Sequence, residues 1–176
     1  MRLLFLLIIL CYSCTNDPVL VKEFIHEENL FIEKIEGAKI LHTEKGSLKV
    51  KITANTIERF KTQPQLVFSN DLEVIFYNDS ALVESILKGR SAEINEDNNI
   101  MMVYENVILS SSEGKILETE ELIWDQKNNQ IFTNKEVIIT TQKEIINGSG
   151  FRSNPDFSKY SISKINGIVK LENLNE

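Results

Sequence analysis

The sequence predicts an all-β fold made of antiparallel sheets. Beyond Asn29 the apolar residues occur in short segments that alternate with polar residues, which is typical of strands with one buried face. Clusters rich in Gly, Asn, Asp and Ser separate these segments at hairpin spacing. No segment there keeps the apolar period of about 3.6 residues that marks an amphipathic helix.

Composition limits the size and the chemistry of the protein. The chain has 176 residues and is 42% hydrophobic, as expected of one globular domain. Its 26 acidic and 19 basic residues give a formal charge of −7, which argues against general binding to nucleic acid. Two Cys, two His and seven Gly leave little material for a metal centre, a disulfide framework or a phosphate-binding loop. We therefore expect no cofactor, no metal and no nucleic-acid partner.

The N-terminus predicts an export signal. Arg2 precedes an apolar run over residues 3–10, which is far shorter than the roughly 20 residues of a membrane-spanning helix. A small residue, Ser13, stands directly before Cys14, an arrangement that resembles a bacterial lipobox. Cys11-Tyr12 departs from the aliphatic and small residues usual at those positions. We expect residues 1–13 to be a lipoprotein signal peptide and Cys14 to be lipidated; the alternative is an uncleaved signal anchor.

Residues 14–29 are expected to form a tether. This segment is polar and contains Pro18, with at most one or two helical turns around Val21–Ile25. Residues 30–176 would then form the β domain.

Two segments show the strand pattern most clearly. Residues 48–54 alternate strictly, so that Leu48, Val50 and Ile52 share one face. Residues 72–77 place Leu72, Val74 and Phe76 on one face in the same way. Each segment predicts a strand with one apolar and one solvated face.

The chain also repeats itself. Residues 94–99 align without gaps on residues 124–129, and residues 106–111 align on residues 136–141, 30 positions further along in each case. A unit of two or three strands is too small to bury its own face, so such units must stack or fold over one another. A chance match in a chain rich in Asn and Ile is the alternative.

The segment 117–124 changes its alternation. Leu117 and Thr119 share one parity, whereas Leu122 and Trp124 have the other. A β-bulge near Glu120-Glu121 would bring all four side chains to one face. Without a bulge, Glu118 and Glu120 would share the face of Trp124.

Several of these segments together resemble a known family. They are the run 116–125, the segments 130–133 and 137–140, and the glycine-containing segment 147–157. In order and spacing they resemble the lipopolysaccharide-transport β-jellyroll family and, more narrowly, its LptC branch. The resemblance covers roughly residues 30–171. Members are commonly held by a transmembrane helix, whereas this chain has a lipobox.

The resemblance implies an open β-jellyroll, two antiparallel sheets with an apolar groove between them. It implies a non-enzymatic component that accepts lipopolysaccharide from an inner-membrane ABC transporter and passes it along a periplasmic bridge of β-jellyroll proteins to the outer membrane. The expected partners are therefore lipopolysaccharide, the transporter subunits and the bridge protein. The expected location is the periplasm, with a lipid anchor in the inner membrane. The chain lacks a phosphate-binding G-x-x-x-x-G-K-[ST] motif, which fits hydrolysis by a partner.

The expected groove is lined by the inward residues of the alternating strands. Because an acidic protein is a poor clamp for a phosphorylated sugar, we expect the acyl chains to supply the attraction. The alternative is that any of these residues belongs to the core of a closed sandwich. The expected groove residues are Val50, Ile52, Leu72, Val74, Phe76, Val107, Leu109, Leu117, Trp124, Val137, Ile139 and Phe151.

Partner contacts are expected at the sheet edges, because unpaired strand edges can accept another strand. The resemblance implies that a C-terminal edge at about 160–171, with Ile162, Ile165 and Ile168, meets the next jellyroll. An N-terminal edge at about 30–41 would meet the transporter. The alternative is an edge protected by lysines that pairs with nothing.

Other chemistries find little support. His26 and His42 have no neighbours at metal-ligand spacing. Glu118, Glu120 and Glu121 would suit sugar hydrolysis only at a defined separation that local sequence does not establish. The rival functions are a structural or carbohydrate-binding envelope lipoprotein with a closed sandwich and, more distantly, an extracellular hydrolase.

The lipobox generates a direct prediction. Each buried acyl methylene contributes about 0.8 kcal/mol, so two or three chains on Cys14 would hold the protein on a membrane without a spanning helix. Mass spectrometry of membrane-extracted protein should find residues 1–13 removed and Cys14 acylated. An intact Met1, or an unmodified Cys14, would contradict the prediction.

Overall fold

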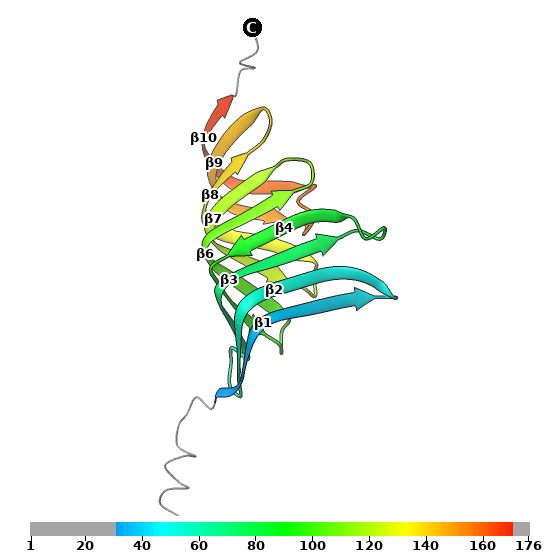
Figure 1. Cartoon of the computed structure of the whole chain (residues 1–176). Coiled ribbons are helices and arrows are strands. Elements are labelled where there is room, and N and C mark those ends of the chain that lie inside the picture. The colour runs from blue at the N-terminus through cyan, green and yellow to red at the C-terminus, as the bar shows by residue number, and fades with distance from the viewer. Residues whose placement is uncertain (1–30, 171–176) are drawn as a thin grey trace, which may run out of the picture. The chain divides into compact units, whose positions relative to one another are not determined.

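The structure is a computed structural model that describes residues 31–170, and the predicted all-β fold is confirmed (Figure 1). The described residues contain no helix. The signal peptide, Cys14, the tether and residues 171–176 lie outside the described range. The strands are β1 (Phe31–Glu44), β2 (Ser47–Phe60), β3 (Leu66–Tyr77), β4 (Val83–Gly89), β5 (Ser91–Asn95), β6 (Ile100–Ser111), β7 (Ile116–Asp125), β8 (Gln130–Thr140), β9 (Glu144–Ser153) and β10 (Tyr160–Lys170).

All ten strands belong to one antiparallel sheet with the order β1-β2-β3-β4-β6-β7-β8-β9-β10. The short strand β5 pairs with β3 and β6, the same two neighbours as β4. Strands β4 and β5 are therefore two halves of one strand, interrupted at Arg90. The two expected sheets are the two halves of a single folded sheet.

A row of bulges and register shifts folds the sheet on itself. The shifts fall between Ala54 and Thr56 in β2, at Asn70-Asp71 in β3 and at Glu105-Asn106 in β6. Similar shifts occur in β7 and β8. Because a bulge bends its strand, each long strand contributes one half to each of two facing layers. The bend lies on the left of Figure 1, and the strands run from it toward the right.

We call these layers wall A and wall B. Wall A comprises residues 38–54, 72–89, 107–119, 136–149 and 164–170. Wall B comprises residues 31–36, 56–69, 91–104, 121–133 and 151–163. The walls are continuous through the bend and end in hairpin turns on the opposite side.

The predicted bulge in the 117–124 segment is confirmed. Strand β7 shifts register against β8 between Thr119 and Ile123. Leu117, Thr119, Leu122 and Trp124 are all buried. Glu118 and Glu120 are exposed, so the arrangement expected without a bulge does not occur.

The 30-residue repeat corresponds to two equivalent turns. In the β5–β6 turn the backbone amide of Asn98 donates to Oδ1 of Asn95, at 3.3 Å. In the β7–β8 turn the amide of Asn128 donates to Oδ1 of Asp125, at 2.9 Å. Both turns end on an asparagine with a positive φ, which Asn tolerates better than most residues. The repeat therefore encodes one hairpin turn twice.

The loop between β9 and β10, residues 154–159, closes one half of the open side; we call it the closing loop. Its Phe157 is fully buried between the walls, where it packs edge-on against Phe151 with centroids 5.5 Å apart. From wall A, the Ser85 hydroxyl donates to the carbonyl oxygen of Pro155. Lys115 Nζ donates to the carbonyl oxygens of Phe157, at 3.1 Å, and Ser158, at 3.2 Å. The closing loop thus joins the tips of the two walls.

Gly89 lies at a closely packed part of the bend and generates a stability prediction. A Cβ at this position would collide with the side chain of Val103 and lie 3.2 Å from the carbonyl oxygen of Tyr104. We expect Gly89→Ala to lower the free energy of unfolding by about 1–3 kcal/mol, because it overpacks a closed site. The measurement is the urea midpoint of unfolding at unchanged m-value.

Gly167→Ala is the matched control. A Cβ at Gly167 would have no heavy atom within 4 Å, and this glycine lies in an edge strand. Its effect should stay within about 0.5 kcal/mol. Equal effects of the two substitutions would show that the bend does not depend on close approach at Gly89.

Candidate functional site

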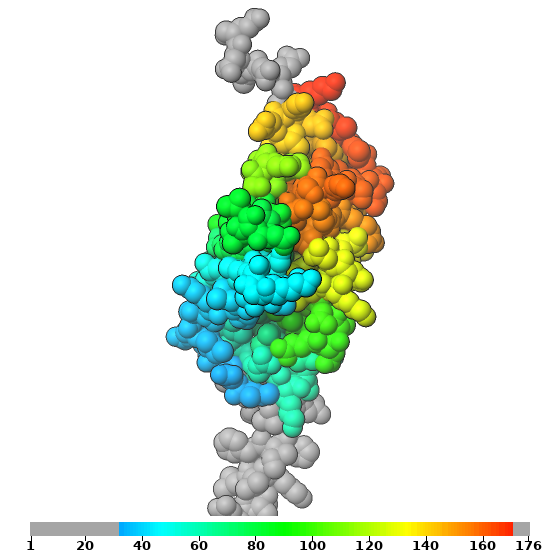
Figure 2. Space-filling model, turned by 90° about the vertical axis from the view of Figure 1, so that its right-hand side faces the viewer, coloured from blue at the N-terminus to red at the C-terminus, as the bar shows by residue number. Residues whose placement is uncertain are grey.

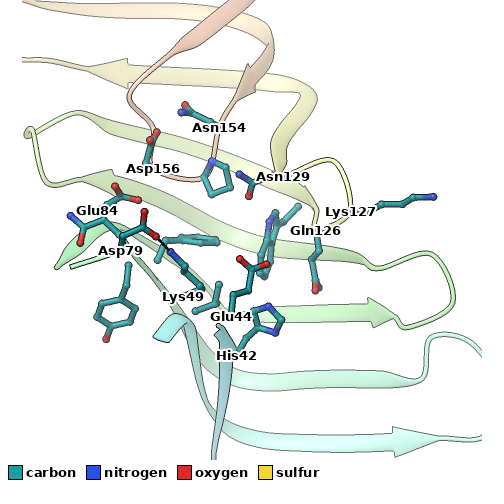
Figure 3. A pocket seen from close by; sticks show the side chains of 16 residues that line it. His42, Glu44, Lys49, Asp79, Glu84, Gln126, Lys127, Asn129, Asn154 and Asp156 are labelled. Carbon is teal, nitrogen blue, oxygen red and sulfur yellow. Dashed lines mark hydrogen bonds and ion pairs between the residues drawn. The ribbon is translucent and has the colours of Figure 1, made fainter. Parts of the chain in front are cut away.

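Two adjoining cavities open between the walls on the side away from the bend. The larger has a volume of about 530 Å³ and the smaller about 290 Å³. Both are lined by His42, Val50, Trp124 and Gln126, so we treat them as one cleft. Figure 2 looks onto this side, where the cyan β1–β2 hairpin of wall A lies beside the yellow β7–β8 turn of wall B. Figure 3 shows the larger cavity from close by.

The floor of the cleft is the part of the hydrophobic core that solvent can reach. Val50, Ile52 and Phe76 come from wall A, and Leu66, Ile94 and Trp124 come from wall B. These six side chains are 4–8% exposed, whereas much of the remaining core is completely buried.

Phe76 and Trp124 join the two walls across the floor. Their rings meet edge to face, with centroids 5.0 Å apart and planes at 86°. This geometry is favourable for aromatic pairs and adds to the burial of both rings. The pair therefore holds the walls together at the base of the cleft.

The predicted groove residues divide into two groups. Four of them, Val50, Ile52, Phe76 and Trp124, line the cleft. The other eight are 0–4% exposed and lie in the packed core: Leu72, Val74, Val107, Leu109, Leu117, Val137, Ile139 and Phe151. That the cleft holds lipid stays a prediction.

Sequence reasoning missed two residues of the floor. Ile94 occupies the position in the repeat that matches Trp124, so the repeat itself was a signal for it. Leu66 alternates with Phe68 in a short segment, and nothing else in that segment indicates that Leu66 lines a cleft. Both lie in wall B, opposite the residues predicted from wall A.

Trp124 carries an unused hydrogen-bond donor. Its side chain is 7% exposed and its Nε1 has no hydrogen-bond partner among the described residues. Buried polar groups are nearly always paired, and this indole N–H, which is itself buried, is an exception.

The rim of the cleft is polar and on balance acidic. Glu44, Asp79, Glu84 and Asp156 lie around the larger cavity, with Lys49, Lys127 and His42 (Figure 3). An ion pair between Lys49 and Asp79 crosses from β2 to the β3–β4 turn. The hydrogen bond between them lowers the pKa of Asp79 and raises that of Lys49.

The surroundings of Glu84 disfavour the charged form of its carboxyl group. Burial raises its pKa, and the negative charge of Asp156 on the closing loop raises it further. Lys49 acts in the opposite direction. The carboxylates at the rim repel one another and would repel an incoming anion.

The two predicted edges are the two edges of the sheet. Strand β1 ends the sheet on one side and β10 on the other. Ile165 and Ile168 of β10 are about half exposed, whereas Ile162 is partly buried and packs against the core. On β1, Ile32 and Ile35 are exposed. Exposed apolar side chains on unpaired edges suit the addition of another chain, and partner binding stays a prediction.

Within residues 31–170 no helix has the length and apolar character needed to cross a bilayer. The same residues contain no group of three or more His, Cys, Asp or Glu side chains arranged to hold a metal ion.

Comparison with known families finds a match over most of the chain. The profile of the family described as "Lipopolysaccharide-assembly, LptC-related" matches residues 2–164. The match spans every described strand from β1 to β9 and part of β10. No curated protein matches the chain.

Proposed function

Because this chain belongs to the LptC-related lipopolysaccharide-assembly family, we propose that it is a membrane-tethered, non-enzymatic carrier of lipopolysaccharide. It accepts the lipid from an inner-membrane ABC transporter and passes it along a periplasmic bridge of β-jellyroll proteins to the outer membrane. The observation that carries this proposal is the cleft between the walls, which has an apolar floor.

The cleft is suited to acyl chains. Each methylene that leaves water contributes about 0.8 kcal/mol, and the side chains of the floor are apolar. The acidic rim would not hold a phosphorylated headgroup strongly. A carrier that binds mainly through its apolar part can release the lipid when another apolar groove is presented next to it.

The sheet edges are suited to the neighbours of a carrier. A jellyroll that pairs with β10 would extend both walls of the sheet. We assign the β10 edge to the bridge protein and the β1 edge to the transporter. Acylated Cys14, followed by the tether 14–29, would keep the domain at the membrane.

Lipid capture in the cleft tests the proposal. Ile40 of β1 lines the smaller cavity and is 36% exposed, so a photo-crosslinking residue there should not disturb the core. With p-benzoylphenylalanine at Ile40, irradiation of cells should give an adduct with lipopolysaccharide. Gel mobility and immunodetection of the lipid measure it.

Ile138 is the matched control. It is 43% exposed and does not line the cleft, so the same probe at this position should capture no lipid. Capture at neither position would favour a closed sandwich with a structural or carbohydrate-binding role. Equal capture at both would show contact that does not depend on the cleft.

Partner choice by the edges is a separate prediction. Ile165→Lys/Ile168→Lys places two charges on the β10 edge, at exposed positions where the fold should tolerate them. This variant should lose co-purification with the bridge protein, because strand addition would bury the new charges.

Ile32→Lys/Ile35→Lys makes the same change on the β1 edge. It should retain the bridge protein and lose the transporter. Pull-down of both partners by each variant measures the assignment, and an unchanged pattern in both variants would refute it.

A further inference from the structure

A third cavity lies beside the cleft and differs from it in charge. This depression, of about 460 Å³, is formed by the start of β8, the end of β9 and the start of β10. Two cations, Arg152 and Lys159, line it together with amide and hydroxyl groups, and no carboxylate does. We call it the basic depression. In a chain of net charge −7, a cavity lined by cations without acids is unexpected.

Arg152 is held in place without being neutralised. Its Nη1 donates to Oε1 of Gln130 at 3.1 Å, and its guanidinium lies over the ring of Phe132, 5.2 Å from the centroid. Both partners are uncharged. By contrast, Arg59 donates to both carboxylate oxygens of Glu96, at 2.9 and 3.3 Å. The remaining N–H groups of Arg152 form the planar fork that suits a phosphate.

Lys159 is the second unpaired cation. No carboxylate of the described chain lies within ion-pair distance of either Lys159 or Arg152. The backbone of Lys159 is fixed, because its amide donates to Asn154 Oδ1 at 3.1 Å and its carbonyl accepts from Ser153 Oγ at 3.0 Å. Ser161, two residues on, pairs with Arg152 across the β9–β10 ladder. The fold therefore brings the two cations to one small area.

The basic depression adjoins the cleft. Asn129 and Asn154 line both the depression and the larger cavity of the cleft. A molecule with its apolar part on the cleft floor can therefore extend a polar group over these two asparagines toward Arg152 and Lys159. The acidic rim on the other sides of the cleft would repel the same group.

We infer that the basic depression binds a phosphate group on the headgroup of the lipid whose acyl chains occupy the cleft. This inference rests on the proposed function. The depression would orient the bound lipid. Its headgroup would lie toward β8–β10, the side of the sheet that ends in the β10 edge. The acidic rim excludes phosphate elsewhere, and Arg152 with Lys159 accepts it here.

The test uses the full-length protein in detergent and three probes. They are bisphosphorylated lipid A, the same lipid A with both phosphates removed, and inorganic phosphate. The chain has a single tryptophan, Trp124 in the cleft floor, so its fluorescence reports occupancy of the cleft. Native mass spectrometry gives an independent count of bound lipid.

The wild-type protein should bind bisphosphorylated lipid A about tenfold more tightly than the dephosphorylated lipid, because charge-assisted hydrogen bonds are gained. Arg152→Gln/Lys159→Gln should remove this preference and leave the affinity for the dephosphorylated lipid unchanged. The preference should also shrink at high salt. Lys61→Gln/Lys143→Gln, which removes two exposed charges outside the cleft and the depression, should retain it.

The outcomes separate the inference from the proposed function. Binding of both lipids with equal affinity by wild type and variant would overturn the inference and leave the carrier function standing. Failure of both lipids to bind would overturn both. If inorganic phosphate binds the wild type as tightly as the bisphosphorylated lipid, the site serves a free anion and the headgroup assignment is wrong.

Discussion

The bend that crosses every long strand is the constraint on which the molecule depends. It is built from backbone conformations that most residues avoid, with positive φ at Asn70-Asp71 and Glu105-Asn106, and from the missing side chain at Gly89. Because each long strand runs through the bend from one wall to the other, the walls cannot separate at the back. They can part only at the hairpin turns. The side on which a cleft opens is therefore fixed by the row of bulges and not by the residues that line the cleft.

The closing loop decides how much of that side stays open. Phe157 fills the space between the walls near β9, and Ser85 and Lys115 of wall A hold the loop by its carbonyl oxygens. Toward β1–β3 no such loop lies between the walls of the described chain, and the core residues there are slightly exposed. One sheet thus forms a dry sandwich at its C-terminal side and a cleft at its N-terminal side. The expected open groove and its alternative, a closed sandwich, thus correspond in shape to different halves of the domain, and the function of each half stays a prediction.

The sequence predicted the features that depend on the alternation of apolar and polar residues. It did not predict which of the inward residues line the cleft and which are completely buried. The parity change between Thr119 and Leu122 was enough to predict the bulge in β7. Because side chains alternate between the two faces of a strand, only a bulge can keep residues of both parities on the same face. Val50 and Leu109 obey the same alternation, yet one lines the cleft and the other is completely buried. Phe157, which is buried between the walls on the β9 side, lies in a segment with the composition of an ordinary turn, so the sequence did not indicate which half of the domain would be filled. The sequence likewise did not show that β4 and β5 are two halves of one strand, because a break within one strand resembles a turn between two separate strands.

The net charge of the chain did not predict how charge is distributed around the cleft. That distribution follows from the topology of the sheet. The turns at the tips carry Asp and Asn because these residues favour tight turns, and tips from both walls surround the cleft. Glu44 and Glu84 add negative charge from the neighbouring ends of β1 and β4. An acidic rim is therefore a consequence of building a cleft between hairpin ends. Arg152 escapes this trend because it stands within β9, where Phe132 and Gln130 of the neighbouring strand support its guanidinium. At the inferred phosphate site, a cation on a strand beside a rim of acidic turns would give an amphiphile one favourable orientation, which a uniformly charged rim could not do.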